Sequence, residues 1–445
     1  MPELIRKKKK MSSFEMIAFG FAGVILLGAI ILMLPISSSA GVVTPFDKTL
    51  FTATSAVCVT GLVVVDTGSY WSAFGQAVIL LLIQTGGLGV ITVVASFSMV
   101  SGRKISLMQR STMQDAISAP KVGGIVRLTK FILQGTFLIE LIGAILMLPV
   151  FCKDYGWKGI WMSVFHSVSA FCNAGFDILG TAGQTFPSLT GYIANPLINL
   201  VIMLLIVIGG IGFLTWDDFC TNKWNLKRYR LQSKIILVTT AVLILLPAIF
   251  FFLSDFAGFS MGKRILASLF QSVTLRTAGF NTADLGAMND SSKAIMTLMM
   301  LIGGSPGSTA GGMKTTTIAV LILNAFATFG REPETEVFGR RFDNTVVKNA
   351  ATIAILYFFL FFAGGIAISQ IEHVALSDCL FETASAVGTA GLTLGITTEL
   401  GLVSHLILVV LMYLGRVGGL TLIYAAISVK IQSGAKRPLD KITVG

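Results

Sequence analysis

The chain has 445 residues, of which 54% are hydrophobic and 12% are charged, and its formal net charge at pH 7 is +11. A soluble globular domain carries about twice this share of charged residues, so the composition excludes that class and favours an integral membrane protein. The positive charge does not indicate nucleic-acid binding, because most of the 33 lysines and arginines lie in short connecting segments between apolar stretches. These segments are residues 6–10, 103–130, 223–234, 331–348 and 430–441.

Eight apolar stretches are long enough to cross about 30 Å of hydrocarbon. In chain order they cover roughly residues 16–35, 71–100, 131–152, 195–216, 235–254, 294–330, 349–371 and 400–429. The basic segments all fall on one side of this arrangement, and the positive-inside rule then places both termini in the cytoplasm. We therefore expect an all-α protein with eight transmembrane spans in a cell membrane.

A shorter segment of about a dozen residues lies inside each pair of spans, and such a segment is typical of a re-entrant or buried helix because it cannot cross. The four segments cover about residues 46–57, 160–171, 263–275 and 374–387. Each pair of spans starts and ends on the same side, so the units are parallel repeats around an axis along the membrane normal. The expected repeats are residues 1–102, 103–222, 223–342 (with a broken second span) and 343–445.

Each short segment leads into a motif that ends on glycine: VTG, NAG, TAG and TAG. Glycine accepts positive φ, which lets successive carbonyl oxygens point to one axis and replace the hydration shell of a cation. A single such glycine is more simply explained as the end of a helix, but four matched copies at repeat spacing predict a pore. The predicted ion-binding residues are Val59, Thr60, Gly61, Asn173, Ala174, Gly175, Thr277, Ala278, Gly279, Thr389, Ala390 and Gly391.

At these motifs the sequence resembles the Trk/Ktr/HKT superfamily of potassium transporters, and most closely the bacterial KtrB-type membrane subunit. The resemblance covers nearly the whole chain and implies four M1–pore–M2 units around a pseudo-four-fold pore, with one filter glycine in each unit. Relatives with serine at the first filter position tend to favour sodium, so Gly61 favours potassium as the transported ion.

The resemblance also implies a homodimer in the bacterial plasma membrane that sits on a cytosolic RCK-type ring, KtrA-like or KtrC-like, which binds ATP or ADP. The basic segments 103–130 and 331–348 can dock such a ring, and anionic lipid attracts the same charges. We expect no cofactor on this chain itself. The histidines have no metal-ligand spacing, so potassium at the filter carbonyls is the only metal expected.

The sixth apolar stretch contains GGSPGSTAGGMKT, residues 303–315, where glycine and proline disfavour a continuous helix. We expect two half-helices joined by a loop, and the resemblance implies that this loop is an intramembrane gate. Arg416, a costly charge inside the last span, is expected to hydrogen-bond the loop carbonyls, with a purely structural pairing as the alternative. The predicted gate residues are Gly303, Gly304, Ser305, Pro306, Gly307, Ser308, Thr309, Ala310, Gly311, Gly312, Met313, Lys314 and Arg416.

Two other interpretations of the loop are weaker. A phosphate-binding P-loop needs GxxxxGK[ST] after a strand, but Met313 separates Gly312 from Lys314. An extramembrane loop would turn the flanking pieces into separate spans and place the basic segment 331–348 outside.

Two further charges lie within apolar surroundings. Arg276 stands three residues before Gly279, where the other units carry small residues, and we expect it to pair with a carboxylate such as Glu382 rather than to face the pore. Glu140 has no counterpart in the other units and is expected to make a structural pair or to line a watery crevice.

Other function classes fit the sequence less well than a pore. An intramembrane enzyme is disfavoured because the adjacent acids Asp217 and Asp218 lie at a span end without a repeated metal-binding pattern. An alternating-access carrier also uses broken helices, but usually with two halves and a midplane site. The sequence therefore predicts potassium uptake through a gated, channel-like pore, with such a carrier or a less selective sodium/potassium transporter as alternatives.

Overall fold

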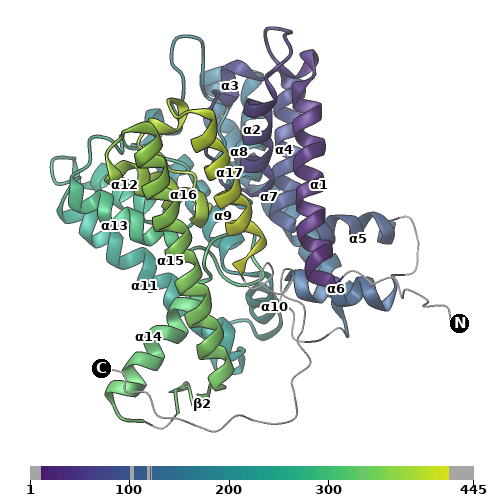
Figure 1. Cartoon of the computed structure of the whole chain (residues 1–445), viewed down its shortest axis with the longest axis vertical. Coiled ribbons are helices and arrows are strands. Elements are labelled where there is room, and N and C mark those ends of the chain that lie inside the picture. The colour runs from purple at the N-terminus through teal and green to yellow at the C-terminus, as the bar shows by residue number, and fades with distance from the viewer. Residues whose placement is uncertain (1–11, 101–104, 118–120, 122, 333, 420–445) are drawn as a thin grey trace, which may run out of the picture.

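The protein is a bundle of helices in the computed structural model, which describes residues 12–100, 105–117, 121, 123–332 and 334–419 (Figure 1). Its strands, within those residues, are a two-stranded antiparallel ribbon of β1 (Glu336–Val337) and β2 (Arg340–Arg341). The predicted class, an all-α membrane protein, is confirmed. The basic segments 6–10 and 430–441, and residues 420–429 of the last predicted span, lie outside the described residues.

A long helix, a short helix and a returning helix follow one another four times along the chain. The long helices are α1 (Ser13–Met33), α7 (Ile125–Tyr155), α11 (Leu231–Leu253) and α15 (Asn344–Glu372). The short helices are α2 (Phe46–Val57), α8 (Lys158–Phe171), α12 (Met261–Thr274) and α16 (Leu376–Gly388), close to the predicted short segments. The returning helices are α4 (Ala73–Leu88), α9 (Pro196–Gly210), α13 (Asp290–Leu301) and α17 (Leu402–Val417).

The remaining helices connect or extend this pattern. They are η1 (Pro35–Ser37), α3 (Thr67–Tyr70), α5 (Val90–Val100), α6 (Leu107–Ile117), η2 (Thr190–Tyr192), α10 (Phe213–Asn222), η3 (Leu226–Arg228), α14 (Thr315–Phe329) and η4 (Ile396–Thr398). Capping residues set several boundaries. Ser12 and Glu15 form a capping box at the start of α1, and Asn195 caps α9 ahead of Pro196 at its first position.

The long helices α1, α7, α11 and α15 are long and apolar enough to cross a membrane. They also carry large apolar side chains on their surfaces, such as Phe19, Leu246 and Ile355, which are 67%, 65% and 71% exposed. Exposed phenylalanine and leucine at this density is unfavourable in water and is expected on a face that contacts lipid. The described helices therefore place the protein in the membrane by their surface as well as by their length.

Two returning helices bend sharply. The axis turns by 99° between α4 and α5 and by 97° between α9 and α10. Gly89 and Gly212 stand at the bends with φ of +85° and +92°, a conformation that residues with a Cβ rarely adopt. Counting each bent pair as one span gives up to six candidate spans among the described helices, so eight spans remains a prediction.

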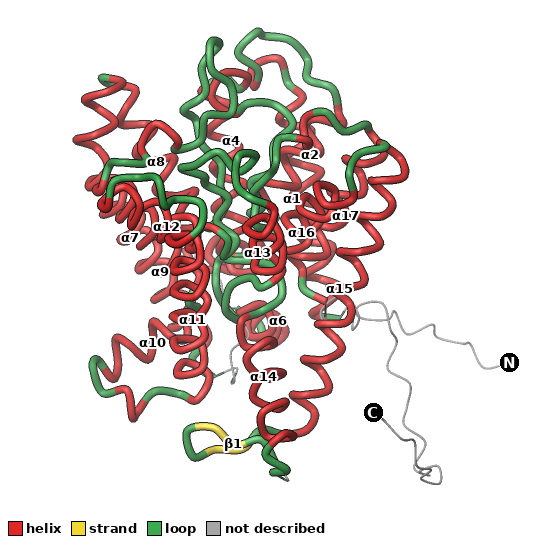
Figure 2. Tube along the Cα trace, turned by 90° about the vertical axis from the view of Figure 1, so that its left-hand side faces the viewer, coloured by secondary structure: helices red, strands yellow, loops and turns green. Residues whose placement is uncertain are grey.

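The helices close into a ring of contacts. Each returning helix packs on the short helix that follows it in the chain: α4 on α8, α9 on α12 and α13 on α16. The last returning helix, α17, packs on the first short helix, α2, and so completes the circle. The loops that follow the short helices gather inside this circle, as the central column of loop segments in Figure 2 shows.

Candidate functional site

The backbone makes the same turn after each short helix, and we call these segments the glycine turns: residues 59–61, 173–175, 277–279 and 389–391. In each turn a non-glycine residue with positive φ is followed two positions later by a glycine with positive φ. The pairs are Val59 (49°) and Gly61 (97°), Asn173 (58°) and Gly175 (69°), Thr277 (59°) and Gly279 (81°), and Thr389 (52°) and Gly391 (80°). Positive φ is especially costly for β-branched residues such as valine and threonine, and strain of this kind concentrates at functional sites.

The four glycines lie against one another in cyclic order. A Cβ added to Gly61 would stand 2.6 Å from the carbonyl oxygen of Ala174, and one added to Gly175 would stand 2.7 Å from that of Ala278. The same addition at Gly279 would meet the oxygen of Ala390 at 3.0 Å. At Gly391 it would overlap the oxygen of Thr60, which closes the ring. The structure thus brings all twelve predicted ion-binding residues together, and only glycine fits at the contact points.

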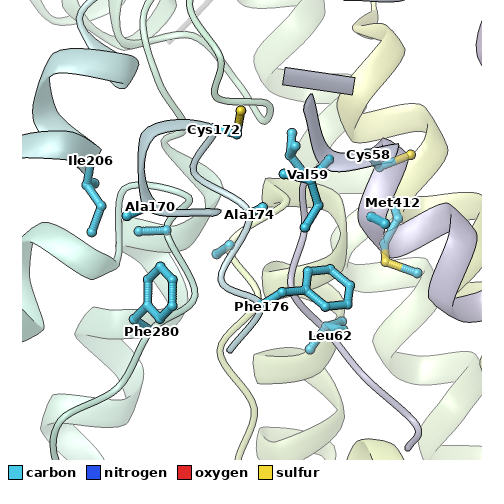
Figure 3. Packing of buried hydrophobic residues seen from close by; sticks show 14 of the residues in the cluster. Cys58, Val59, Leu62, Ala170, Cys172, Ala174, Phe176, Ile206, Phe280 and Met412 are labelled. Carbon is cyan, nitrogen blue, oxygen red and sulfur yellow. The ribbon is translucent and has the colours of Figure 1, made fainter. Parts of the chain in front are cut away.

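The amide groups of the turns point back to the short helices. Thr60 N donates to Ser55 O at 2.8 Å, and the amides of Ala174 and Ala390 make the equivalent bonds, five residues back, at 2.8 Å. The amide of Ala278 donates to Thr274 O, four residues back, at 3.0 Å. The residue that follows each glycine is a buried hydrophobic one, which fixes the far end of each turn in the core. These residues are Leu62, Phe176, Phe280 and Leu392. Figure 3 shows the segment from Cys172 through Ala174 to Phe176 running beside that from Cys58 through Val59 to Leu62.

The carbonyl oxygens that precede the glycines have no hydrogen-bond partner in the part of the chain that the structure describes. The four residues that carry these oxygens are fully buried: Thr60, Ala174, Ala278 and Ala390. Within the described residues, none of their carbonyl groups accepts a hydrogen bond. Buried backbone carbonyls are almost always paired with protein or water. Four such oxygens at the contact points of one ring are therefore placed to bind something with positive charge.

Two cavities lie on opposite sides of this ring. The outer cavity, of about 140 Å³, is lined by the four glycines and by Asp66, Asp177, Thr393 and Thr397. We call the side of the ring that it occupies the outer side. The inner cavity, of about 250 Å³, is lined by residues that include Asp115, Gly312, Lys314 and Arg416.

Residues 186–189 cross the ring on its outer side. Phe186 N donates to Asp66 Oδ1 at 2.8 Å, and Leu189 N donates to Asn281 O at 3.0 Å, so residues 186–189 connect the segments after the first and third glycine turns. Asp66 and Asp177 were not predicted as site residues. Their signal in the sequence was only their distance of a few residues from a glycine motif.

Residues 302–314, which we call the central loop, separate α13 from α14 as the sequence predicted. The loop makes backbone hydrogen bonds to other parts of the bundle: Ser305 N to Gly210 O at 3.0 Å, Thr309 N to Gly209 O at 3.2 Å and Gly312 N to Gly415 O at 3.2 Å. It therefore reaches α9 on one side and α17 on the other. All of the predicted gate residues from Gly303 to Lys314 lie in it.

Thr309 joins the central loop to the second glycine turn. Its hydroxyl lies 3.0 Å from Phe171 O, at the end of α8, and 3.1 Å from Asn173 Oδ1, inside the turn. Because Thr309 is fully buried, these hydrogen bonds are shielded from water. The loop is thus attached directly beneath the ring.

Arg416 ties the central loop to the first unit. Its guanidinium donates to the carbonyl oxygens of Thr309 and Gly86, and to that of Gly87 at 3.2 Å. The predicted hydrogen bond between Arg416 and a loop carbonyl is confirmed. Lys314 Nζ donates to Ala310 O at 2.8 Å within the loop. Two positively charged side chains, those of Lys314 and Arg416, therefore lie on the inner side of the ring.

The expected pairing of Arg276 with Glu382 is wrong. Arg276 is buried at 5% exposure, and its Nε and Nη2 atoms have no hydrogen-bond partner among the described residues. Glu382 instead accepts hydrogen bonds from Thr393 and Thr397. The two side chains lie in different units, and spacing along the sequence carried no information about which groups face them.

Glu140 makes the structural pair that was one of the two expectations for it. Gln84 Nε2 donates to Glu140 Oε2 at 3.2 Å, and the side chain is 6% exposed. Asp217 and Asp218 also have a structural role, because both lie close to Arg230, at 2.6 and 3.6 Å. None of these three acids belongs to the ring or to the central loop.

The chain is similar to known proteins over nearly its whole length. A family model described as TrkH, cation transport protein, matches residues 24–435. The chain is 36% identical over 452 residues to the potassium/sodium uptake protein NtpJ of Enterococcus hirae, which covers 99% of both chains. It is also 36% identical over 438 residues to the Ktr system potassium uptake protein B of Bacillus subtilis, which covers 97% of this chain and 96% of the relative.

The fold is similar to that of a solved structure. The crystal structure of the potassium transporter TrkH from Vibrio parahaemolyticus superposes with a TM-score of 0.73 at 18% sequence identity, over 96% of this chain and 87% of that one. At this identity the likeness speaks for the fold alone.

Proposed function

The chain belongs to the TrkH family of cation transport proteins, and we propose that it takes up potassium ions across the cell membrane through a channel-like pore. The filter of this pore is the ring of four glycine turns. The observation that carries the proposal is the set of four buried carbonyl oxygens, at Thr60, Ala174, Ala278 and Ala390, that have no partner among the described residues. Such oxygens replace the water that a cation loses when it enters a narrow pore.

Potassium is favoured over other ions by the chemistry of the ring and by the relatives. Backbone carbonyls are neutral, strongly dipolar ligands, and no carboxylate side chain belongs to the twelve residues of the turns. Relatives that match over almost their whole length carry potassium uptake in their names. Gly61 at the first position of the ring agrees with this choice.

The central loop is proposed as the gate. It lies on the inner side of the ring, is bonded to α9 and α17, and is held by Arg416. An ion leaving the ring toward the inner cavity meets this loop and the charges of Lys314 and Arg416. Movement of the loop would remove both the steric and the electrostatic barrier, so the resting arrangement supports a closed pore.

The proposed assembly follows the same family resemblance. The chain would form eight spans in four M1–pore–M2 repeats, with both termini in the cytoplasm, and would work as a homodimer. A cytosolic RCK-type ring that binds ATP or ADP would set the position of the gate. The relatives named as Ktr system proteins support a multi-component transporter, and the basic segments between the units give a docking surface of suitable charge.

Rubidium uptake into liposomes that contain the purified protein tests this proposal, because rubidium is a potassium analogue of similar size. We expect saturable uptake that external potassium inhibits strongly and that sodium and lithium inhibit weakly. Addition of the nucleotide-loaded cytosolic partner should change the rate. Absence of saturable uptake, or uptake unaffected by potassium, would contradict the assignment.

A less selective potassium/sodium transporter is the second candidate. The observation that favours it is the name of the Enterococcus relative, which includes sodium. The same experiment separates the two candidates, since sodium would then inhibit rubidium uptake about as strongly as potassium does.

A further inference from the structure

The four short helices differ at one buried position behind the glycine turns. This position lies nine residues before each ring glycine. It holds Thr52, His166, Phe270 and Glu382, whose exposed fractions are 1%, 0%, 0% and 0%. Burying a carboxylate destabilises the folded protein unless hydrogen bonds satisfy its oxygens, so Glu382 needs hydrogen-bond donors close by.

Glu382 binds the segment that follows its own glycine turn. Its Oε1 accepts hydrogen bonds from Thr393 Oγ1 at 2.6 Å and from Leu394 N at 3.0 Å. Its Oε2 accepts one from Thr397 Oγ1 at 2.6 Å. All three donors belong to residues 393–397, which begin two positions after Gly391. Hydrogen bonds of this length to a carboxylate are among the stronger ones in proteins.

The equivalent side chains in the other units make no such connection within the described residues. The hydroxyl of Thr52 donates to Lys48 O at 2.9 Å, inside its own helix. His166 contacts Met162 O through Nδ1 at 2.8 Å, also inside its own helix, and its Nε2 is without a partner. Phe270 has no polar group. Ser169 and Thr274 connect the second and third short helices to the segments after their turns, but they reach only the residue directly after the ring glycine, at Phe176 O and Phe280 O. In the fourth unit, by contrast, Glu382 connects the short helix to residues 393–397, which lie farther along the outgoing segment.

Residues 393–397 form part of the entrance to the ring. Thr393 and Thr397 line the outer cavity together with Gly391. Gly391 in turn lies against Thr60 of the first turn, where the ring closes. A shift of residues 393–397 would therefore move the contact between the fourth and first turns and with it the spacing of the carbonyl oxygens.

We propose that Glu382 is a specificity-determining positioning residue of the transport reaction. Its carboxylate fixes residues 393–397 and so holds the carbonyl of Ala390 at the distance that suits a dehydrated potassium ion rather than a smaller one. It acts through Thr393 and Thr397 and does not touch the ion. The inference rests on the proposed function of the ring as an ion filter.

The test measures ion preference, which a purely structural role would not change. Rubidium uptake into liposomes is recorded against increasing sodium, and the preference is the ratio of the half-inhibiting sodium concentration to the KM for rubidium. Loss of charge-assisted hydrogen bonds in Glu382→Ala should lower this ratio about tenfold. Glu382→Gln keeps an oxygen acceptor for Leu394 N, and Thr397→Val removes one donor, so each should lower the ratio about threefold.

Thr52→Val is the matched control, because it removes a hydroxyl at the equivalent position whose hydrogen bond stays within α2. We expect it to keep the wild-type ratio. If Glu382→Ala does not fold, the two milder variants decide the outcome. An unchanged ratio in the folded variants, with uptake that falls only in proportion to folded protein, would overturn the assignment of Glu382. Failure of the wild-type protein to take up rubidium would instead overturn the proposed function.

Discussion

The ring of glycine turns is built four times over from equivalent residues, whereas the layer beneath it comes from one loop and one arginine. Above, Gly61, Gly175, Gly279 and Gly391 take the same conformation and meet the same kind of neighbour. Below, the central loop of the third unit crosses toward α9 and α17 and is held by Arg416 of the fourth unit. A spherical ion is best surrounded by equal ligands, but a gate needs only one movable segment. These two requirements explain why the ring is four-fold symmetric and the layer beneath it is not.

The same contrast is visible in the returning helices. Three of them are followed within two residues by a glycine with nearly equal φ: Gly89 (+85°), Gly212 (+92°) and Gly418 (+91°). In the third unit the helix ends instead at Leu301, and the central loop follows. The third unit therefore replaces a single glycine bend with a loop of its own.

The largest effect is expected from breaking the symmetric layer at Gly175. In Gly175→Ala the new methyl group would stand 2.7 Å from the carbonyl oxygen of Ala278 and from the Cα of Gly279, so the ring must widen. Overpacking of this kind costs about 1–3 kcal/mol, and we expect rubidium uptake to fall by about ten- to a hundredfold. Initial uptake rates in liposomes, normalised to folded protein, measure the loss.

Gly41→Ala is the control for this variant. Gly41 has a φ of +68°, close to the +69° of Gly175, but no atom would lie within 4 Å of its Cβ. Backbone strain is thus matched and the steric contact is absent. Equal losses of uptake in the two variants would contradict a role for close packing in the ring.

The next effect concerns Arg416, which holds the asymmetric layer. Arg416→Ala removes hydrogen bonds to Thr309 and to the paired carbonyls of Gly86 and Gly87. Hydrogen bonds to charged groups contribute about 1.5–3 kcal/mol each, so we expect the loop to open and uptake to rise by about tenfold or more. Uptake is measured without the cytosolic partner, so that the gate starts in its resting position.

Arg416→Lys separates charge from hydrogen bonding. Lysine keeps the positive charge but lacks the planar fork that reaches carbonyls on different segments. An intermediate increase is expected if both effects close the pore. A decrease of uptake in Arg416→Ala would mean that the arginine supports the open state.

The sequence predicted the symmetric layer well and the asymmetric one only in outline. Four similar motifs marked the glycines, and the run of glycine and proline marked the loop. Val59 and Thr277 were among the predicted ion-binding residues, but nothing in a valine or a threonine indicates positive φ, so their backbone strain was found only in the structure. The sequence did not predict the position or the angle of the bends at Gly89 and Gly212, because the apolar composition continues through them. The partners of Glu382 depend on which side chains meet after folding, and spacing along the chain does not contain that information.

A smaller effect is expected at Thr309, where the loop touches the ring. Thr309→Val keeps the shape of the side chain but loses the hydrogen bond to Phe171 O and the contact with Asn173 Oδ1. The loss of about 1 kcal/mol should raise uptake about three- to fivefold. Thr328→Val is the control, because its hydroxyl binds only Asn324 O of its own exposed helix at 2.8 Å. If both variants leave uptake unchanged, the loop is not held closed at this point.

The smallest effect is expected at Arg276, which lies directly before the third glycine turn and has no charged counterpart in the other units. Its guanidinium is buried, and among the described residues it has no carboxylate partner and no hydrogen-bond partner for Nε and Nη2. The buried charge therefore destabilises the folded protein. Arg276→Met keeps an unbranched apolar chain and removes the charge, and we expect an equal or slightly higher melting temperature and uptake within about twofold of wild type. Thermal unfolding in detergent measures the first. Arg230→Met is the comparison, since Arg230 pairs with Asp217 at 2.6 Å and its loss should lower the melting temperature. A larger drop for Arg276→Met than for Arg230→Met would mean that the buried guanidinium is paired after all.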